Sequence, residues 1–104
     1  MSEWKVWYQP HAKFAKRYFS GQLTIAPGLA RFVGKKETVT IDNAKAIERK
    51  MVGMNTWIHV AYDAAGEARD AYFLDRRMLG WSGALGGNDK LFAELEGALQ
   101  PSRE

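Results

Sequence analysis

The sequence has no cysteine and only two histidines. The lack of cysteine excludes disulfides, thiolate metal sites and cysteine nucleophiles. The histidines, His11 and His59, are far apart, without an i, i+4 spacing or a nearby carboxylate cluster, so the sequence predicts no metal site and no bound cofactor. The serines lack a matched base and acid, so we expect no enzymatic activity. His59 lies between Ile58 and Val60, a pattern typical of a histidine packed in a strand.

Long apolar runs are absent too. No segment approaches the roughly 20 apolar residues of a membrane span, and the first residues, MSEWKVWYQPHAK, lack the apolar core of a signal peptide. The 104 residues contain no linker, repeat or low-complexity tract. We therefore expect one cytoplasmic domain that occupies residues 1–104.

Acidic residues are scarce in the first third of the chain. Residues 1–36 hold seven Lys or Arg and one acid, whereas the remaining 68 residues hold eight cations and eleven acids, for a formal net charge of +3. Such asymmetry can indicate an anionic partner. It can also disappear once strands from both parts of the chain interleave in the fold.

Apolar and polar residues alternate through most of the chain. In FSGQLTIAPGLARFVGKKETVTI, residues 19–41, Pro27-Gly28 fits a tight turn, and Val39 and Ile41 share the inward side of the last strand. Similar segments of five to nine residues follow up to residue 75. They predict an antiparallel meander over residues 19–75, within a sandwich or barrel rather than a parallel sheet.

The two ends of the chain have other patterns. Five apolar residues between 91 and 99 fall within an arc of roughly 120°, which predicts a helix over residues 88–99. The segment WKVWY near the start alternates like a strand, and a short basic amphipathic helix is predicted from Pro10 onward. The residues expected in the core are Leu23, Ile25, Phe32, Val39, Ile41, Ile47, Trp57, Phe73, Phe92, Leu95 and Leu99.

The order of these elements resembles a known family. GQLTIAPGLARFVGKK resembles the opening of GRAM domains, and VTIDNAKAIERKMVG the segment that follows in GRAM and bacterial pleckstrin-homology-like domains. WIHVAYDAAGEARDAYFLD is similar to their closing hairpin, and NDKLFAELEGAL to their C-terminal helix. The resemblance covers about residues 19–99. It implies an α+β, mainly β fold: a bent antiparallel barrel of about seven strands capped by a C-terminal helix, with a short N-terminal helix or strand extension.

The same resemblance implies a non-enzymatic binding module, because members of this family bind lipids, peptides or partner domains. The phosphoinositide-binding members carry a lysine on the first strand and a basic-x-arginine pair on the next, whereas Arg31 stands alone here. We therefore expect no high-affinity inositol phosphate site. The helix also lacks the tryptophan usual in pleckstrin-homology domains, and we expect Phe92 to take its place.

Basic residues and tryptophans supply the candidate binding residues. The candidates for an anionic or lipid surface are Lys13, Lys16, Arg17, Arg31, Lys35 and Lys36, and the candidate interface aromatics are Trp4, Trp7 and Trp81. A basic amphipathic helix can adsorb to an anionic membrane, but it can equally pack on the barrel with a solvated polar side. Nucleic acid is not favoured as a partner, because no nucleic-acid-binding motif is present.

The glycine-rich segment GWSGALGG, residues 80–87, precedes the predicted helix, where free backbone N–H groups can hold an anion. It lacks the Gly-Lys-Ser/Thr of a P-loop, and the simpler interpretation is a loop whose Trp81 packs on the barrel. The sequence thus predicts a module for a protein or peptide partner first, and for a weakly bound anionic lipid surface second. The alternative is a small-molecule-binding protein or small enzyme that uses residues 80–87. A homo-oligomer is left open.

Overall fold

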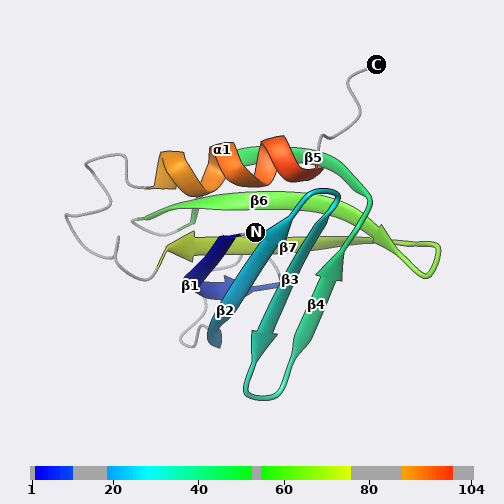
Figure 1. The fold of residues 1–104 in the computed structure, drawn as a ribbon, viewed down its shortest axis with the longest axis horizontal. Helices are drawn as coiled ribbons and strands as arrows, with labels where there is room; N and C mark the ends of the chain where they lie inside the picture. The colour runs from blue at the N-terminus through cyan, green and yellow to red at the C-terminus, as the bar shows by residue number, and fades with distance from the viewer. Residues whose placement is uncertain (1, 11–18, 53–54, 76–87, 100–104) are drawn as a thin grey trace.

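The computed structural model describes residues 2–10, 19–52, 55–75 and 88–99, which form a β-sheet with one helix against it (Figure 1). The strands are β1 (Ser2–Gln9), β2 (Phe19–Ala26), β3 (Leu29–Gly34), β4 (Thr38–Ile41), β5 (Ala44–Val52), β6 (Asn55–Ala64) and β7 (Glu67–Asp75), and the helix is α1 (Asn88–Leu99). The predicted mainly β fold and the predicted C-terminal helix are confirmed.

Two predicted features lie outside the described residues. They are the basic helix over residues 11–18 and the glycine-rich segment 80–87. Within the described part of the chain, no helix is long and apolar enough to cross a membrane.

All seven strands of the described residues join one antiparallel sheet, in the order β4-β3-β2-β1-β7-β6-β5. The predicted continuous meander is wrong at one point, because the consecutive strands β4 and β5 lie at opposite edges of the sheet. The chain turns a corner at Asp42 and Asn43 instead of forming a hairpin, and the Asn43 carbonyl accepts a hydrogen bond from the Asp63 N–H at 3.3 Å. In Figure 1, β2, β3 and β4 run steeply across β5, β6 and β7, and α1 lies along β5 and β6.

The N-terminal strand β1 joins the two halves of the sheet. It pairs with β2 over residues 2–8 and with β7 over residues 6–9. The predicted strand is therefore confirmed, but its predicted role as an extension is wrong. The reason is that WKVWY is apolar on both faces: Val6 and Tyr8 are buried in one cluster, and Trp7 packs against another. A strand that is apolar on both faces is stable only with cover on both sides.

The main core lies between the sheet and α1, and most of the predicted core residues are in it. The predicted residues that are buried are Leu23, Ile25, Phe32, Val39, Ile41, Ile47, Trp57, Phe73 and Leu95. Phe92 and Leu99 are only half-buried, because the buried stripe of α1 is centred on Leu91 and Leu95. Phe92 lies at the edge of that stripe, where the Arg49 guanidinium stands 4.3 Å from the centre of its ring.

A second buried cluster occupies the opposite side of the sheet. Trp57, Tyr72 and Leu74 form it, and Trp7 packs against them. Trp57 is thus buried as predicted, but in this cluster rather than in the main core. The side chain of Gln9 is 1% exposed, and neither polar atom of its amide has a hydrogen-bond partner among the described residues. The central strands of the sheet therefore bury side chains on both faces.

Candidate functional site

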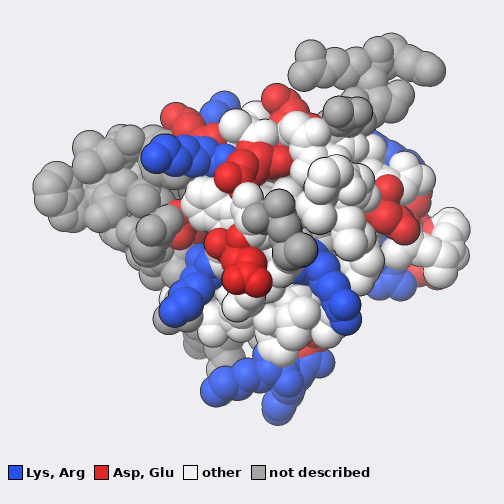
Figure 2. Space-filling view, in the orientation of Figure 1, with Lys and Arg blue, Asp and Glu red and all other residues white. Residues whose placement is uncertain are grey.

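Three of the predicted basic residues lie on the hairpin of β3 and β4. Arg31 is in the middle of β3, and Lys35 and Lys36 are in the turn that joins it to β4; all three are exposed. The Gly34 N–H donates to the Glu37 carbonyl at 2.8 Å and closes this turn. Figure 2 shows Lys and Arg side chains gathered at the lower end of the molecule, where Figure 1 places the turn. The other predicted basic residues, Lys13, Lys16 and Arg17, lie outside the described residues.

Arg31 stands on a side of the sheet that faces away from the main core. We call this surface the arginine face and define it by Gln22, Thr24, Leu29, Arg31, Val33, Thr38 and Thr40. Arg31 is directly opposite Thr24 on β2 and Thr40 on β4. Val33 is 47% exposed and Leu29 is 36% exposed, and both are among the large apolar side chains that the described part of the chain leaves at the surface. The arginine face therefore combines exposed β-branched side chains with one cation, and the same side of the sheet continues onto β1, where Glu3 is opposite Thr24 and Lys5 is opposite Gln22.

The two edges of the sheet differ in how they are protected against pairing with another strand. Edge strands are commonly protected by charged side chains, by bulges or by a covering helix. β5 has all three: its side chains include cations, its register is irregular between Ala44 and Ala46, and Arg49 pairs with Asp89 of α1 at 2.8 Å. β4 spans Thr38–Ile41 without a charge, a proline or a bulge, and in the described part of the chain it pairs only with β3. Among the described residues, its short length is the one protective feature that β4 has.

The predicted interface tryptophans are packed against the protein where they are described. Trp4 is half-buried, and its indole N–H donates to the Glu94 carboxylate at 2.9 Å. Trp7 is also half-buried and packs on the second cluster. Trp81 lies outside the described residues. A role of these tryptophans in an interface stays a prediction.

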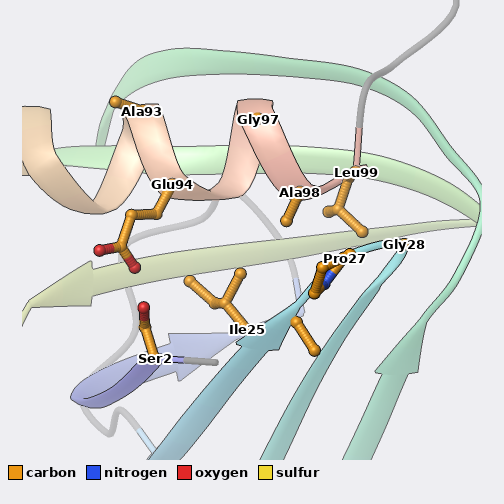
Figure 3. A pocket seen from close by; sticks show the side chains of 10 residues that line it. Ser2, Ile25, Pro27, Gly28, Ala93, Glu94, Gly97, Ala98 and Leu99 are labelled. Atoms are coloured by element: carbon orange, nitrogen blue, oxygen red, sulfur yellow. The ribbon is translucent and has the colours of Figure 1, made fainter.

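A groove runs along the C-terminal half of α1 (Figure 3). Its volume is about 650 Å³, and its lining residues are Ser2, Ile25, Ala26, Pro27, Gly28, Ala93, Glu94, Gly97, Ala98 and Leu99. The turn between β2 and β3 is fixed to the helix by the Gly28 N–H, which donates to the Ala98 carbonyl at 2.8 Å. Figure 3 shows the polar side chains of Ser2 and Glu94 at one end and the apolar side chains of Pro27 and Leu99 at the other.

His59 connects three strands, an arrangement that the sequence analysis missed. Its ring stacks on Tyr72 with centroids 4.5 Å apart, its Nδ1 lies 3.3 Å from Glu48 Oε1, and its Nε2 lies 2.8 Å from Asp70 Oδ1. The expectation of a packed strand histidine is confirmed, because its side chain is only 14% exposed. The sequence analysis predicted no carboxylate cluster near it, and the structure places two carboxylates, Glu48 and Asp70, beside its ring. The equal spacing of 11 residues on either side of His59 was the available signal, since two hairpins of that length place these residues on adjacent strands.

This network links β5, β6 and β7 through the side chain of His59. Only a doubly protonated imidazole ring can donate to both carboxylates at once, and both carboxylates are more than half exposed, where ion pairs contribute about 0–1 kcal/mol. Among the described residues, no group of three His, Asp or Glu side chains is placed to hold a metal ion.

Buried tyrosines line the main core and the second cluster. Burial raises the pKa of Tyr8 to about 12, and Tyr62 and Glu37 add to the shift. Burial also raises the pKa values of Tyr62 and Tyr72. These hydroxyls therefore remain protonated at neutral pH, where they act as neutral polar groups.

Comparisons with protein-family models, with curated proteins and with solved structures found no match for the chain.

Proposed function

We propose that the chain is a pleckstrin-homology-like interaction module that binds a protein or peptide partner along the arginine face and the free edge of β4. The observation that carries this proposal is the contrast between the two edges of the sheet. β5 is charged, irregular and next to α1, whereas β4 is uncharged, regular and bordered by exposed apolar side chains. The resemblance of residues 19–99, the seven antiparallel strands and the helix that follows them support the barrel assignment.

The edge of β4 suits an extended segment of the partner. A peptide that adds a strand to a sheet gains affinity from main-chain hydrogen bonds and specificity from alternate side chains. Every second side chain of such a strand would lie on the arginine face, beside Thr40 and within two strands of Arg31. An acidic residue there would lie two strands from the Arg31 cation, as Glu3 of β1 does on the other side. We therefore expect the partner segment to be extended and to carry acidic residues at alternate positions.

Selection from a library of displayed peptides tests this function, because the selection itself reveals which sequences bind. The selected peptides are then titrated by calorimetry into the wild type and into an Arg31→Glu variant. Replacing the cation by an anion is expected to weaken binding roughly tenfold, since a like charge replaces an attraction. A Lys50→Glu variant, which makes the same charge change on β5, is the matched control and should bind like the wild type. Selected peptides that bind the Arg31→Glu variant as tightly as the wild type would contradict the proposal.

An anionic lipid surface is the second candidate partner, favoured by the exposed Lys35 and Lys36 at the end of the hairpin. Each basic residue near an anionic bilayer contributes about 1 kcal/mol before screening, so two or three cations support only weak binding that salt abolishes. The test is co-sedimentation with phosphatidylserine vesicles at low and high salt. A Lys35→Glu, Lys36→Glu variant should lose the binding, and a Lys45→Glu, Lys50→Glu variant of equal charge should retain it. Wild-type protein that stays in the supernatant at low salt rules out this candidate.

A further inference from the structure

The groove beside α1 is distinct from the arginine face, and its charge is of the opposite sign. Glu94 is the one charged residue among those that line it. The Trp4 indole N–H holds one oxygen of this carboxylate at 2.9 Å, which fixes the position of the group. In Figure 3, the Glu94 carboxylate and the Ser2 hydroxyl point toward each other across one end of the groove. A positioned carboxylate and a hydroxyl are acceptors for a ligand that donates hydrogen bonds.

The end of the helix lies at the other, apolar end of the groove. A helix C-terminus carries a partial negative charge, which basic residues in the last turn usually offset. α1 has no basic residue in its last turn. In the described part of the chain, no Lys or Arg forms an ion pair with Glu94. The Glu94 carboxylate therefore makes its own end of the groove favour a cation over a neutral or anionic group, independently of the helix C-terminus at the other end.

The rest of the groove is small and apolar. Its volume of about 650 Å³ lies within the range of small-molecule sites, roughly 300–1,000 Å³. Ile25, Pro27 and Leu99 supply apolar walls. Among the described residues, no atom beyond the backbone of the helix lies within 4 Å of the position that a Cβ would occupy at Gly97, so this side of the helix is open to a ligand. The groove thus has room for an apolar chain that extends from the cation at Glu94.

We propose that this groove binds a primary ammonium group carried on a short apolar chain, with the ammonium at Glu94 and Ser2 and the chain along Ile25 and Pro27. The ammonium can belong to a free alkylamine or to a lysine side chain of a peptide. Both sources present the same chemistry to the groove. The site is independent of the proposed partner surface, because no residue that lines the groove is among those that define the arginine face.

The proposal is tested by titrating 15N-labelled protein with hexylammonium and following the amide signals of Gly28, Gly97 and Ala98. Hexanol and hexanoate, added at the same concentrations, separate the effect of charge from that of the chain. Binding with a Kd on the order of 1–10 mM is expected for so small a ligand, with no saturable shifts for hexanoate and at least threefold weaker binding of hexanol. An acetylated, amidated Ala-Leu-Lys-Leu-Ala peptide and its norleucine analogue form a second arm, which distinguishes a lysine side chain from a free amine.

Three variants locate the site. Glu94→Gln keeps an acceptor for the Trp4 indole but removes the charge, and it should weaken hexylammonium binding at least threefold. Glu96→Gln makes the same charge change on the same helix outside the lining and should leave the Kd unchanged. Gly97→Leu fills the groove and should abolish binding, and because leucine favours a helix over glycine, its thermal midpoint should not fall. Equal binding of hexanoate, or an unchanged Kd in both Glu94→Gln and Gly97→Leu, would overturn the proposal without bearing on the arginine face.

Discussion

Gly21 of β2 lies directly opposite Gly34 of β3 in the sheet, and the ring of Phe32 lies over both glycines. A Cβ at Gly21 would come within 2.4 Å of the Val33 carbonyl oxygen and 2.8 Å of the Phe32 ring. A Cβ at Gly34 would come within 3.2 Å of the same ring. The two glycines therefore let a large buried side chain pack against the backbone of the sheet.

Replacing Gly21 by alanine should destabilise the protein by about 1–3 kcal/mol, the range for overpacking of a filled core. We expect the upper part of this range, because the closest atom belongs to the backbone and cannot move aside easily. Urea unfolding measures the change. Gly97→Ala is the matched control, since no described atom beyond the helix backbone lies within 4 Å of its Cβ position, and alanine should stabilise the helix there by about 0.5–1 kcal/mol. Equal unfolding midpoints for Gly21→Ala and the wild type would show that the Val33 backbone and the Phe32 ring do not pack closely against Gly21.

The attachment of α1 to the sheet depends on Leu95, which is fully buried. Leu95→Ala should cost about 2–5 kcal/mol, as large-to-small substitutions in a core do. Leu99 is only half-buried at the end of the same helix, so Leu99→Ala should cost clearly less. Both free energies of unfolding are measured in urea. A loss below about 0.5 kcal/mol for Leu95→Ala, well under the core range, would show that the helix packs on another face.

Alkaline pH should unfold the protein through its buried tyrosines. The pKa of Tyr8 is raised from 10.0 to about 12, so between these values the unfolded chain loses a proton that the folded chain keeps. The stability that Tyr8 contributes is therefore complete below about pH 10 and is lost as the pH rises to about 12, at a total cost on the order of 2 kcal/mol. Urea midpoints at pH 9, 10, 11 and 12 measure this loss. The loss should be smaller in Tyr8→Phe. An identical pH profile for both proteins would show that the loss of stability does not come from Tyr8.

Local patterns in the sequence predicted most of the strands and the C-terminal helix. The order of the strands in the sheet depends on long-range pairing, which those patterns do not specify. Alternation placed Val39 and Ile41 inward, and helical periodicity placed Leu95 on the buried side of α1, because such patterns depend only on neighbouring residues. The position of β1 between β2 and β7 was missed, since no local pattern states which strands a given strand joins. The apolar character of WKVWY on both faces was the available signal.

The candidate sites, too, were predicted where they depend on local sequence and missed where they depend on contacts between distant residues. Arg31 was predicted as a candidate residue for an anionic surface, and in the structure its side chain is exposed. The contact between Trp4 and Glu94 joins residues 90 positions apart, so no spacing in the sequence indicated it. The groove beside α1 depends on that contact and on the bond between Gly28 and Ala98. Both arise from the way the helix lies on the folded sheet, which the sequence pattern does not specify.

Hydrogen exchange of the β4 amides in the presence of a selected peptide tests the proposed function most directly. If the peptide adds a strand to the free edge, the amides of residues 38–41 that point away from β3 should gain protection, because they acquire hydrogen-bond acceptors. The amides of β5 serve as the internal control and should exchange at unchanged rates. Protection confined to β4 and lost in Arg31→Glu is the result that the account predicts. Tight binding of the peptide with unchanged exchange in β4, or with protection on β5 instead, would contradict it.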